Sequence, residues 1–115
     1  MLRAVHQMVD AEPKILDDSV VLRFMDAATL EQIRSNPEHA QARWVRALRA
    51  HVVIRSRYAE DQLAEAVRRG IRQYIILGAG YDSFAYRQPQ WANGLRIFEV
   101  DQPATQRAKQ ERLRE

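Results

Sequence analysis

Cysteine is absent from the 115-residue sequence, which excludes disulfides, thiolate metal sites and a cysteine nucleophile. Long hydrophobic runs are also absent. Near the middle of the chain the longest stretch without a charge or an amide, Tyr74 to Tyr81, has eight residues, whereas a membrane span needs about 20. His6 and Gln7 interrupt the apolar residues at the N-terminus before a secretion signal could form. We therefore expect a soluble, cytoplasmic protein.

Blocks of like charge, low-complexity tracts and Pro/Gly-rich linkers are missing as well, so the chain is expected to form one globular domain. The net charge of +3 and the pI of 9.7 come mainly from 16 arginines. Because the charges alternate in sign, a nucleic-acid partner is not expected. The arginine-rich stretch 43–57 is interpreted as a solvated helix face, and a phosphate-contacting surface is the alternative.

No metal site is expected from the three histidines. His6, His39 and His51 are not at ligand spacing with one another, and no cysteine could join them.

The first half of the sequence has the period of helices, with apolar residues three and four positions apart up to Gly70. The pattern predicts helices over 15–24, 29–35, from 37 through 48, and over 59–69. Gly70 stands where a glycine commonly ends a helix. We interpret residues 1–70 as a helical lid.

The period changes after Gly70. Two short apolar runs, 73–77 and 95–100, predict parallel strands that are buried on both faces. One or two helical turns over 82–87 and a loop around Pro89 separate them, and a last helix begins near Pro103. The predicted fold class is therefore α/β, a helical lid followed by the first β-α-β unit of a Rossmann-like core over residues 71–115. Two strands make a marginal sheet, so we expect an N-terminal fragment, or a truncated relative, of a longer enzyme.

A glycine-rich turn follows the first predicted strand, with Gly78 and Gly80 at its centre. Such a turn lets backbone approach a ligand closely, and its free amides can hold an anionic group; an ordinary tight turn is the alternative. The second strand ends at Asp101, 23 residues after Gly78, where a carboxylate can accept hydrogen bonds from ribose hydroxyls. Asp101 could instead cap the following helix, or it could serve both roles, and Glu99 is the second candidate for the ribose.

A ribose at this place fits either a nicotinamide or flavin dinucleotide or S-adenosylmethionine. The dinucleotide fingerprint needs a third glycine, and Ser83 occupies that position. Dinucleotide domains also commonly begin at the first strand, whereas about 70 residues precede it here. These features favour S-adenosylmethionine.

One arginine is predicted to point inward from the lid. If the helix from Pro37 continues to residue 55, Arg55 shares the apolar face of Trp44 and Leu48. Its guanidinium would suit the carboxylate of an amino-acid-like ligand. An ion pair with a buried acid, or a helix that ends before residue 55, are the alternatives. Four other arginines fall elsewhere on the helical wheel: Arg43, Arg46, Arg49 and Arg57.

Three ordered motifs together resemble the leucine carboxyl methyltransferase family, and in particular its bacterial branch of S-adenosylmethionine-dependent methyltransferases. They are Arg55-Ser56-Arg57-Tyr58 with Asp61; Ile76 to Ser83 with Ala85-Tyr86-Arg87; and Phe98 to Pro103 with Gln106 and Lys109. Ile15-Leu16-Asp17-Asp18 also fits that branch. The resemblance implies a class I methyltransferase core behind a helical lid.

By this resemblance Arg55 faces the methionine carboxylate of the cofactor, or Arg57 does if the register slips. Gly78 and Gly80 match the cofactor loop, and Asp101 matches the ribose-binding acid. The motif also includes Asp82, Tyr86 and Arg87, for which capping and packing of the turn are equally open roles. Family chains are considerably longer than this one.

The first hypothesis is therefore an S-adenosylmethionine-dependent methyltransferase that O-methylates a small molecule or a carboxylate. A carboxylate acceptor arrives ionised, so we assign no catalytic residue and no general base. The second hypothesis is a non-catalytic remnant that binds nucleotide or a partner, and the third is an NAD-binding oxidoreductase domain. The methyl acceptor and the oligomeric state are left open.

Overall fold

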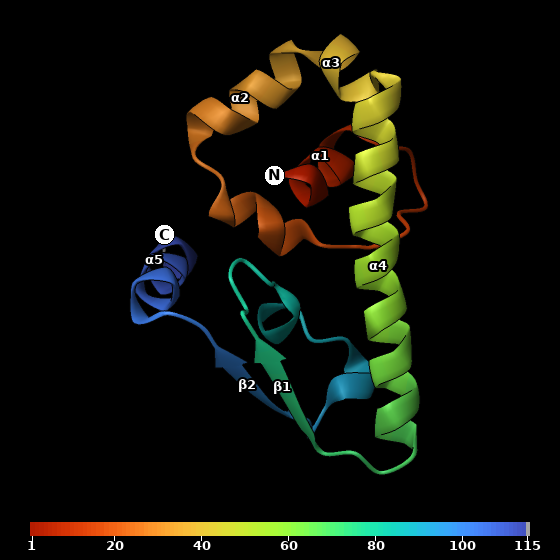
Figure 1. Cartoon of the computed structure of the whole chain (residues 1–115), viewed down its shortest axis with the longest axis vertical. Helices are drawn as coiled ribbons and strands as arrows, with labels where there is room; N and C mark the ends of the chain where they lie inside the picture. The colour runs from red at the N-terminus through yellow and green to blue at the C-terminus, as the bar shows by residue number, and fades with distance from the viewer. Residues whose placement is uncertain (115) are drawn as a thin grey trace.

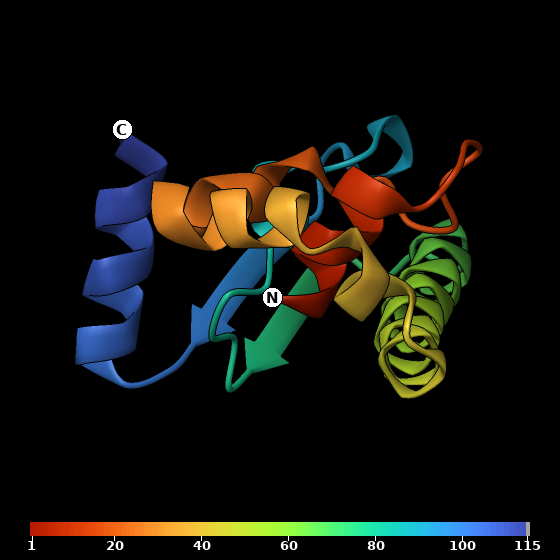
Figure 2. The same ribbon diagram turned by 90° about the horizontal axis from the view of Figure 1, so that it is seen from above.

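The computed structural model describes residues 1–114 and is built around one long helix, with short helices beside its first half and a small sheet beside its second half (Figure 1). The helices are α1 (Leu2–Val9), α2 (Ala27–Ser35), α3 (Pro37–Gln41), α4 (Arg43–Arg68) and α5 (Pro103–Arg114); the strands are β1 (Gln73–Leu77) and β2 (Arg96–Val100); and the 3-10 helices are η1 (Ser19–Phe24), η2 (Phe84–Tyr86) and η3 (Gln90–Ala92). Seen from above, the short helices lie between α5 and α4 (Figure 2).

Of the two helices predicted before residue 36, one is confirmed and the other forms only in its second part. The prediction over 29–35 is confirmed as α2, which begins after Asp26 because that carboxylate accepts the Thr29 N–H at 2.7 Å. The prediction over 15–24 is wrong for its first part. Only η1 is helical there, and the segment before it is irregular because Gln7 of α1 takes up its backbone groups, donating to the Leu16 carbonyl and accepting from the Asp18 N–H.

The central helix was predicted as two pieces and is one helix of 26 residues. The break lies earlier, at Ala42, whose extended backbone separates α3 from α4. The end is as predicted: Gly70 has φ +101°, and the Gly70 and Ile71 N–H groups donate to the Val67 and Ala66 carbonyls, which is the hydrogen-bond pattern of a Schellman motif. No helix among residues 1–114 is long and apolar enough to cross a membrane.

The parallel pairing of the two strands is confirmed, with Tyr74 opposite Ile97 and Leu77 opposite Val100. Their predicted burial on both faces is wrong. Four apolar side chains on one face are between 47 and 77% exposed: Ile75, Leu77, Phe98 and Val100. Only the other face is covered, where Tyr74 and Ile97 pack against a cluster of Leu63, Phe84, Ala92 and Leu95.

A second core cluster lies among the short helices. It contains Ala4 and Val5 of α1, Val21 and Phe24 of η1, Ile33 and Ala40, and Leu113 of α5 packs against it. Helix α5 is also fastened to η1 by polar contacts, since Arg23 donates to the Leu113 carbonyl and Arg112 to the Phe24 carbonyl. Two small cores are thus joined by α4 and by charged side chains.

An ion pair between the buried Arg49 and the partly exposed Asp10 holds α1 against α4. Arg49 donates through Nε and Nη2 to the Asp10 carboxylate at 2.9 and 2.8 Å, and through Nη1 to the Ala40 carbonyl at 2.7 Å. His6 Nδ1 lies 2.7 Å from the same carboxylate. Burial alone would raise the pKa of Asp10, but the hydrogen bonds from Arg49 and His6 hold it below 3.8.

Replacing Asp10 with Asn should lower the free energy of unfolding by about 2 kcal/mol at neutral pH, because the buried Arg49 guanidinium loses its charged partner. The pKa of Asp10 is lower in the folded protein than in the unfolded chain. The stabilisation by the Asp10 carboxylate is therefore complete above the unfolded pKa, and it is lost as the pH falls through the folded pKa. Urea unfolding of both proteins should therefore give curves that converge in acid.

The control for this measurement is Glu31→Gln, which removes an exposed partner of Arg34 at 3.8 Å and should cost less than about 0.5 kcal/mol. Equal losses for Asp10→Asn and Glu31→Gln would contradict a structural role for the pair of Asp10 and Arg49.

Candidate functional site

The glycine turn lies at the carboxyl end of β1, directly beside the end of β2. Gly78 and Gly80 have φ angles of +65° and +48°, a region that favours glycine. The Gly78 and Ala79 N–H groups both donate to the Val100 carbonyl, at 2.8 and 3.2 Å. The parallel register therefore brings the turn against the residue that follows Val100, which is Asp101.

Asp101 contacts the turn through its carboxylate. One oxygen accepts the Gly80 N–H and the other accepts the Gln102 N–H at 2.6 Å. These two hydrogen bonds, in that order, hold the pKa of Asp101 below its usual 3.8, with a smaller contribution from the charge of Lys109. The side chain is therefore ionised at neutral pH. Among the described residues, no N–H group within α5 donates to this carboxylate, so the alternative role of capping the first turn of α5 is not what the geometry shows.

Four of the N–H groups of the turn that were expected to be free are already bonded. The N–H groups of Gly78 and Ala79 bond to Val100, that of Gly80 bonds to Asp101, and that of Asp82 donates to the Ala79 carbonyl at 2.7 Å. The helix that follows, η2, has only three residues and offers little dipole. The turn therefore presents an ionised carboxylate and close backbone rather than a cradle of donors for an anion.

Space above the turn is open at Gly78. A Cβ built there would meet no atom within 4 Å, whereas one at Gly80 would lie 4.0 Å from Asp101 Oδ2. A ligand can thus approach the backbone closely at Gly78.

Glu99, the second candidate for the ribose, is held by neighbouring side chains. Lys109 is fully buried and its Nζ lies 2.5 Å from Glu99 Oε1, while the Tyr86 hydroxyl donates to Oε2 at 3.3 Å. Burial, and then the charge of Glu99, raise the pKa of Tyr86. Both acids are partly exposed, and Asp101 is the one whose carboxylate contacts the glycine turn.

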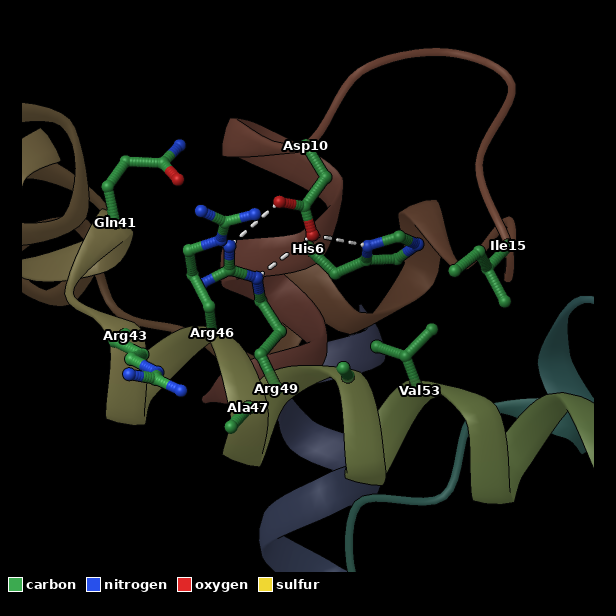
Figure 3. Close-up of a pocket in the computed structure, with 10 residues that line it drawn as sticks. His6, Asp10, Ile15, Gln41, Arg43, Arg46, Ala47, Arg49 and Val53 are labelled. Carbon is green, nitrogen blue, oxygen red and sulfur yellow. Dashed lines mark hydrogen bonds and ion pairs between the residues drawn. The ribbon is translucent and has the colours of Figure 1, made fainter.

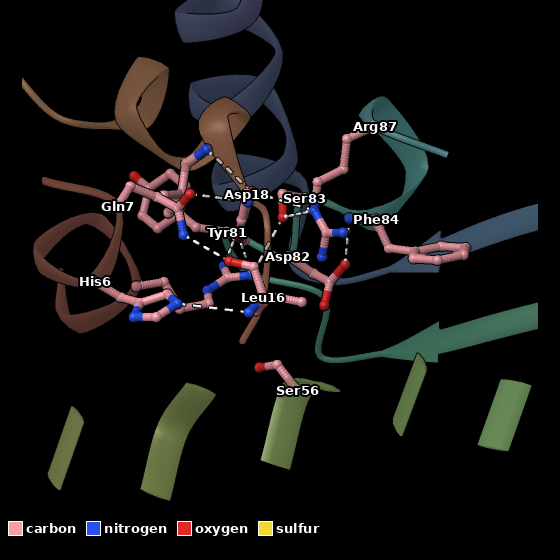
Figure 4. Close-up of polar contacts among 12 residues, drawn as sticks. His6, Gln7, Leu16, Asp18, Ser56, Tyr81, Asp82, Ser83, Phe84 and Arg87 are labelled. Carbon is pink, nitrogen blue, oxygen red and sulfur yellow. Dashed lines mark hydrogen bonds and ion pairs between the residues drawn. The ribbon is translucent and has the colours of Figure 1, made fainter. Parts of the chain in front are cut away.

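A buried carboxylate, Asp18, fastens the other side of the turn to the helices before it (Figure 4). Asp18 Oδ1 lies 3.2 Å from Arg87 Nε, and Oδ2 lies 3.1 Å from Arg3 Nη1, without the alignment of a hydrogen bond. Both arginines also donate to the Ser83 hydroxyl, at 3.0 and 3.2 Å, and Arg3 donates to the Tyr81 carbonyl.

Arg87 carries this network on to α4, where its Nη1 and Nη2 atoms donate to the carboxylate of Glu60. Burial alone would lower the pKa of Arg87, but Glu60 and Asp18 keep it above its usual value. Of the two roles left open for Arg87, the structure shows that it packs the turn against its neighbours. Asp82 caps the turn, since its carboxylate accepts the Phe84 N–H at 2.9 Å. Asp18 was predicted only as part of a helix and of the motif at residues 15–18, because nothing in the local sequence indicates its distant partners.

The prediction that Arg55 points inward is wrong. Arg55 is exposed, and so are its face-mates Trp44 (64%) and Leu48 (47%). The buried stripe of α4 is Val45, Arg49 and Val53, and its inward arginine is Arg49, which the Asp10 carboxylate neutralises. The spacing of valines on either side of Arg49 was the available signal. No ion pair or hydrogen bond brings Arg55 to the glycine turn, and its role toward a ligand stays a prediction.

A family model described as leucine carboxyl methyltransferase matches residues 1–115. The chain is 35% identical over 96 residues to "Putative S-adenosyl-L-methionine-dependent methyltransferase YktD" of Bacillus subtilis, a match that covers 82% of this chain and 31% of the relative. Proteins with the same designation from Frankia alni and Mycobacterium marinum are 39 and 36% identical, over 78 and 90% of this chain and 32 and 36% of their own lengths. The chain thus spans about a third of the length of these relatives.

Replacing Asp18 with Asn should lower the free energy of unfolding by about 3 kcal/mol or more, because two arginines would lose a buried counter-charge. Amide hydrogen exchange should also speed up at Tyr81 and Ser83, which those arginines hold. The matched control is Asp17→Asn at the adjacent exposed position, with an expected change within about 0.5 kcal/mol. Unchanged exchange at the turn in Asp18→Asn would contradict the fastening role.

Proposed function

The chain belongs to the leucine carboxyl methyltransferase family, and on that premise we propose that it contributes the cofactor-binding part of an S-adenosylmethionine-dependent methyltransferase. The expectation drawn from the sequence motifs agrees with this family. Because the chain spans about a third of its relatives' length, the activity of the whole protein is part of the proposal.

The observation that carries the proposal is the contact between the glycine turn and Asp101. An ionised carboxylate whose oxygens accept the Gly80 and Gln102 N–H groups is fixed in position beside the open space at Gly78. Each carboxylate oxygen has further acceptor capacity. Asp101 can therefore accept hydrogen bonds from two adjacent ribose hydroxyls, while Gly78 lets the rest of the nucleoside lie against the backbone.

The hydrogen bonds within the turn favour S-adenosylmethionine over a dinucleotide. A dinucleotide needs free N–H groups and a helix N-terminus for its pyrophosphate. Here four N–H groups of the turn are already bonded, and η2 is a single short turn. S-adenosylmethionine has a ribose but no phosphate, so it makes no such demand.

We assign the helical segment 1–70 the role of a lid over the core that begins at residue 71. Arg55 would meet the carboxylate of the cofactor from the lid, since its exposed guanidinium has no ion-pair partner within residues 1–114. Arg57 is the weaker candidate because it already pairs with Asp61.

When bound, the cofactor supplies a methyl group on a sulfonium for an in-line displacement. The chain's own residues would orient it: Asp101 at the ribose, Gly78 and Gly80 at the backbone contact, and Arg55 at the carboxylate. Tyr86 is not suited to act as a base, because its pKa is raised and its hydroxyl donates to Glu99. We propose an oxygen of a small molecule or a carboxylate as the acceptor, since an ionised carboxylate needs no base from this part of the protein.

Asp101→Asn should weaken the binding of S-adenosylhomocysteine about tenfold or more, because the ribose loses a charged acceptor. Calorimetric titration of the folded chain measures this. The control is Asp26→Asn, which alters another carboxylate that accepts a backbone N–H but leaves a helix cap that Asn makes equally well. NAD in place of S-adenosylhomocysteine should give no saturable heat.

Two results would contradict the proposal. Equal affinity for S-adenosylhomocysteine in Asp101→Asn and the unmodified chain would remove Asp101 from the site. Saturable binding of NAD but not of S-adenosylhomocysteine would favour the oxidoreductase hypothesis.

Gly78→Ala tests close approach of the ligand to the backbone. Gly78 and Gly94 both have positive φ angles, +65° and +84°, and a Cβ at either would meet nothing within 4 Å. Alanine at each position should therefore cost a similar amount, about 1 kcal/mol of stability. Only Gly78→Ala should also lose affinity for S-adenosylhomocysteine, since its methyl group would occupy ligand space. Equal affinities in the two variants would show that no ligand lies against Gly78.

A further inference from the structure

A cavity of about 690 Å³ lies between α1, the irregular segment after it and the first half of α4 (Figure 3). Its volume is in the range of sites for small molecules. No residue of β1, the glycine turn or β2 lines it. The cavity is therefore separate from the site proposed above.

The charges that line this cavity do not balance. Its ionised groups comprise three guanidinium groups and one carboxylate, that of Asp10. Arg49 and Asp10 neutralise each other at 2.8 Å. Arg43 and Arg46 have no ion-pair partner within 4.0 Å in the part of the chain described. An excess of positive charge remains, and the first turns of α4 add to it through the helix dipole.

The inner wall is rigidly held. Arg49 is 3% exposed and makes three hydrogen bonds, two to Asp10 and one to the Ala40 carbonyl. His6 accepts the Leu16 N–H at Nε2, so its Nδ1 carries the proton and donates to Asp10. In Figure 3 the side chain of Arg46 points toward this cluster. A group bound beside Arg46 would thus meet a wall that does not rearrange.

Apolar side chains, together with the amide of Gln41, form the remainder of the lining. Ile15 comes from the segment after α1, and Ala47, Ala50 and Val53 come from α4. Ile15 is 51% exposed. These groups suit an apolar body attached to the anionic group, so a hydrated inorganic ion would use only part of the cavity.

The cavity and Arg55 occupy opposite sides of α4. Nine residues separate Arg46 from Arg55, and at about 100° per residue the two side chains point about 180° apart. A ligand in the cavity therefore does not compete for Arg55, and its binding can be tested whether or not S-adenosylhomocysteine binds.

We propose that this cavity binds a small organic anion, a phosphate or a carboxylate on an apolar body, through Arg43 and Arg46. This assigns a role to two arginines of the stretch 43–57, which sequence analysis interpreted as a solvated face. The planar guanidinium groups match either oxyanion. Ile15, Ala50 and Val53 contact the apolar body.

The test is titration of the isotope-labelled chain with phenyl phosphate and with benzoate, followed by amide NMR shifts at constant ionic strength. Saturating shifts are expected at Ile15 and along residues 43–50. Inorganic phosphate should bind more weakly because it lacks the apolar body, and neutral benzyl alcohol should not saturate. Arg46→Gln should weaken the binding of phenyl phosphate about tenfold, and Arg43→Gln by a smaller factor.

Arg107→Gln is the matched control, because it removes the same charge from an exposed position on α5 and should leave affinity unchanged. The proposal is overturned if Arg107→Gln weakens binding as much as Arg46→Gln, since the anion would then respond only to net charge. It is also overturned if neither probe saturates, or if the shifts spread over arginines across the surface as for a nucleic-acid backbone. Because Arg43 and Arg46 make no ion pairs within residues 1–114, their variants should remain folded, which their amide spectra show directly.

Discussion

The arrangement of this chain depends on a carboxylate that water does not reach. Asp18 is fully buried, and a buried charge is tolerated only with counter-charges against it. Arg3 and Arg87 provide these, one from α1 and one from the segment after the glycine turn. The same two arginines hold Ser83, and Arg87 reaches Glu60 on α4. The need to neutralise Asp18 thus fixes α1, η1 and α4 relative to the turn.

Ion pairs have this importance here because the apolar cores are small and separate. One cluster lies among the short helices and another lies between α4 and the sheet. Phe24 of η1 packs against Tyr81 with ring centroids 5.4 Å apart, whereas α1 and α4 reach the turn through the charged side chains of Arg3 and Glu60. Buried pairs add little net stability, but they define geometry, since any displacement leaves a charge without its partner. The position of the turn relative to α1 and α4 is therefore set by polar contacts.

Local patterns predicted the parts of the structure whose causes are local. Gly70 ends α4 because the Schellman motif needs only its own neighbours, and two short apolar runs around a glycine turn predicted the parallel pair with Asp101 at the end of the second strand. Local patterns did not decide whether Arg55 or Arg49 is the arginine of α4 that points into the core. Both lie on stripes with apolar residues, and the deciding factor is Asp10, which is 39 residues from Arg49 in sequence. The exposed face of the sheet was missed for a related reason, since burial depends on what packs against a strand.

The turn itself illustrates how an internal contact selects a ligand chemistry. A glycine-rich turn with free donors would suit phosphate, and the sequence alone leaves that option open. Once Val100 and Asp101 have accepted the N–H groups of Gly78, Ala79 and Gly80, the turn has little left to offer an anion. What it offers instead is a carboxylate kept ionised by two of the backbone donors. The same hydrogen bonds that occupy the N–H groups of the turn keep Asp101 ionised, and the proposed preference for hydroxyl groups therefore rests on backbone geometry rather than on the identity of Ser83.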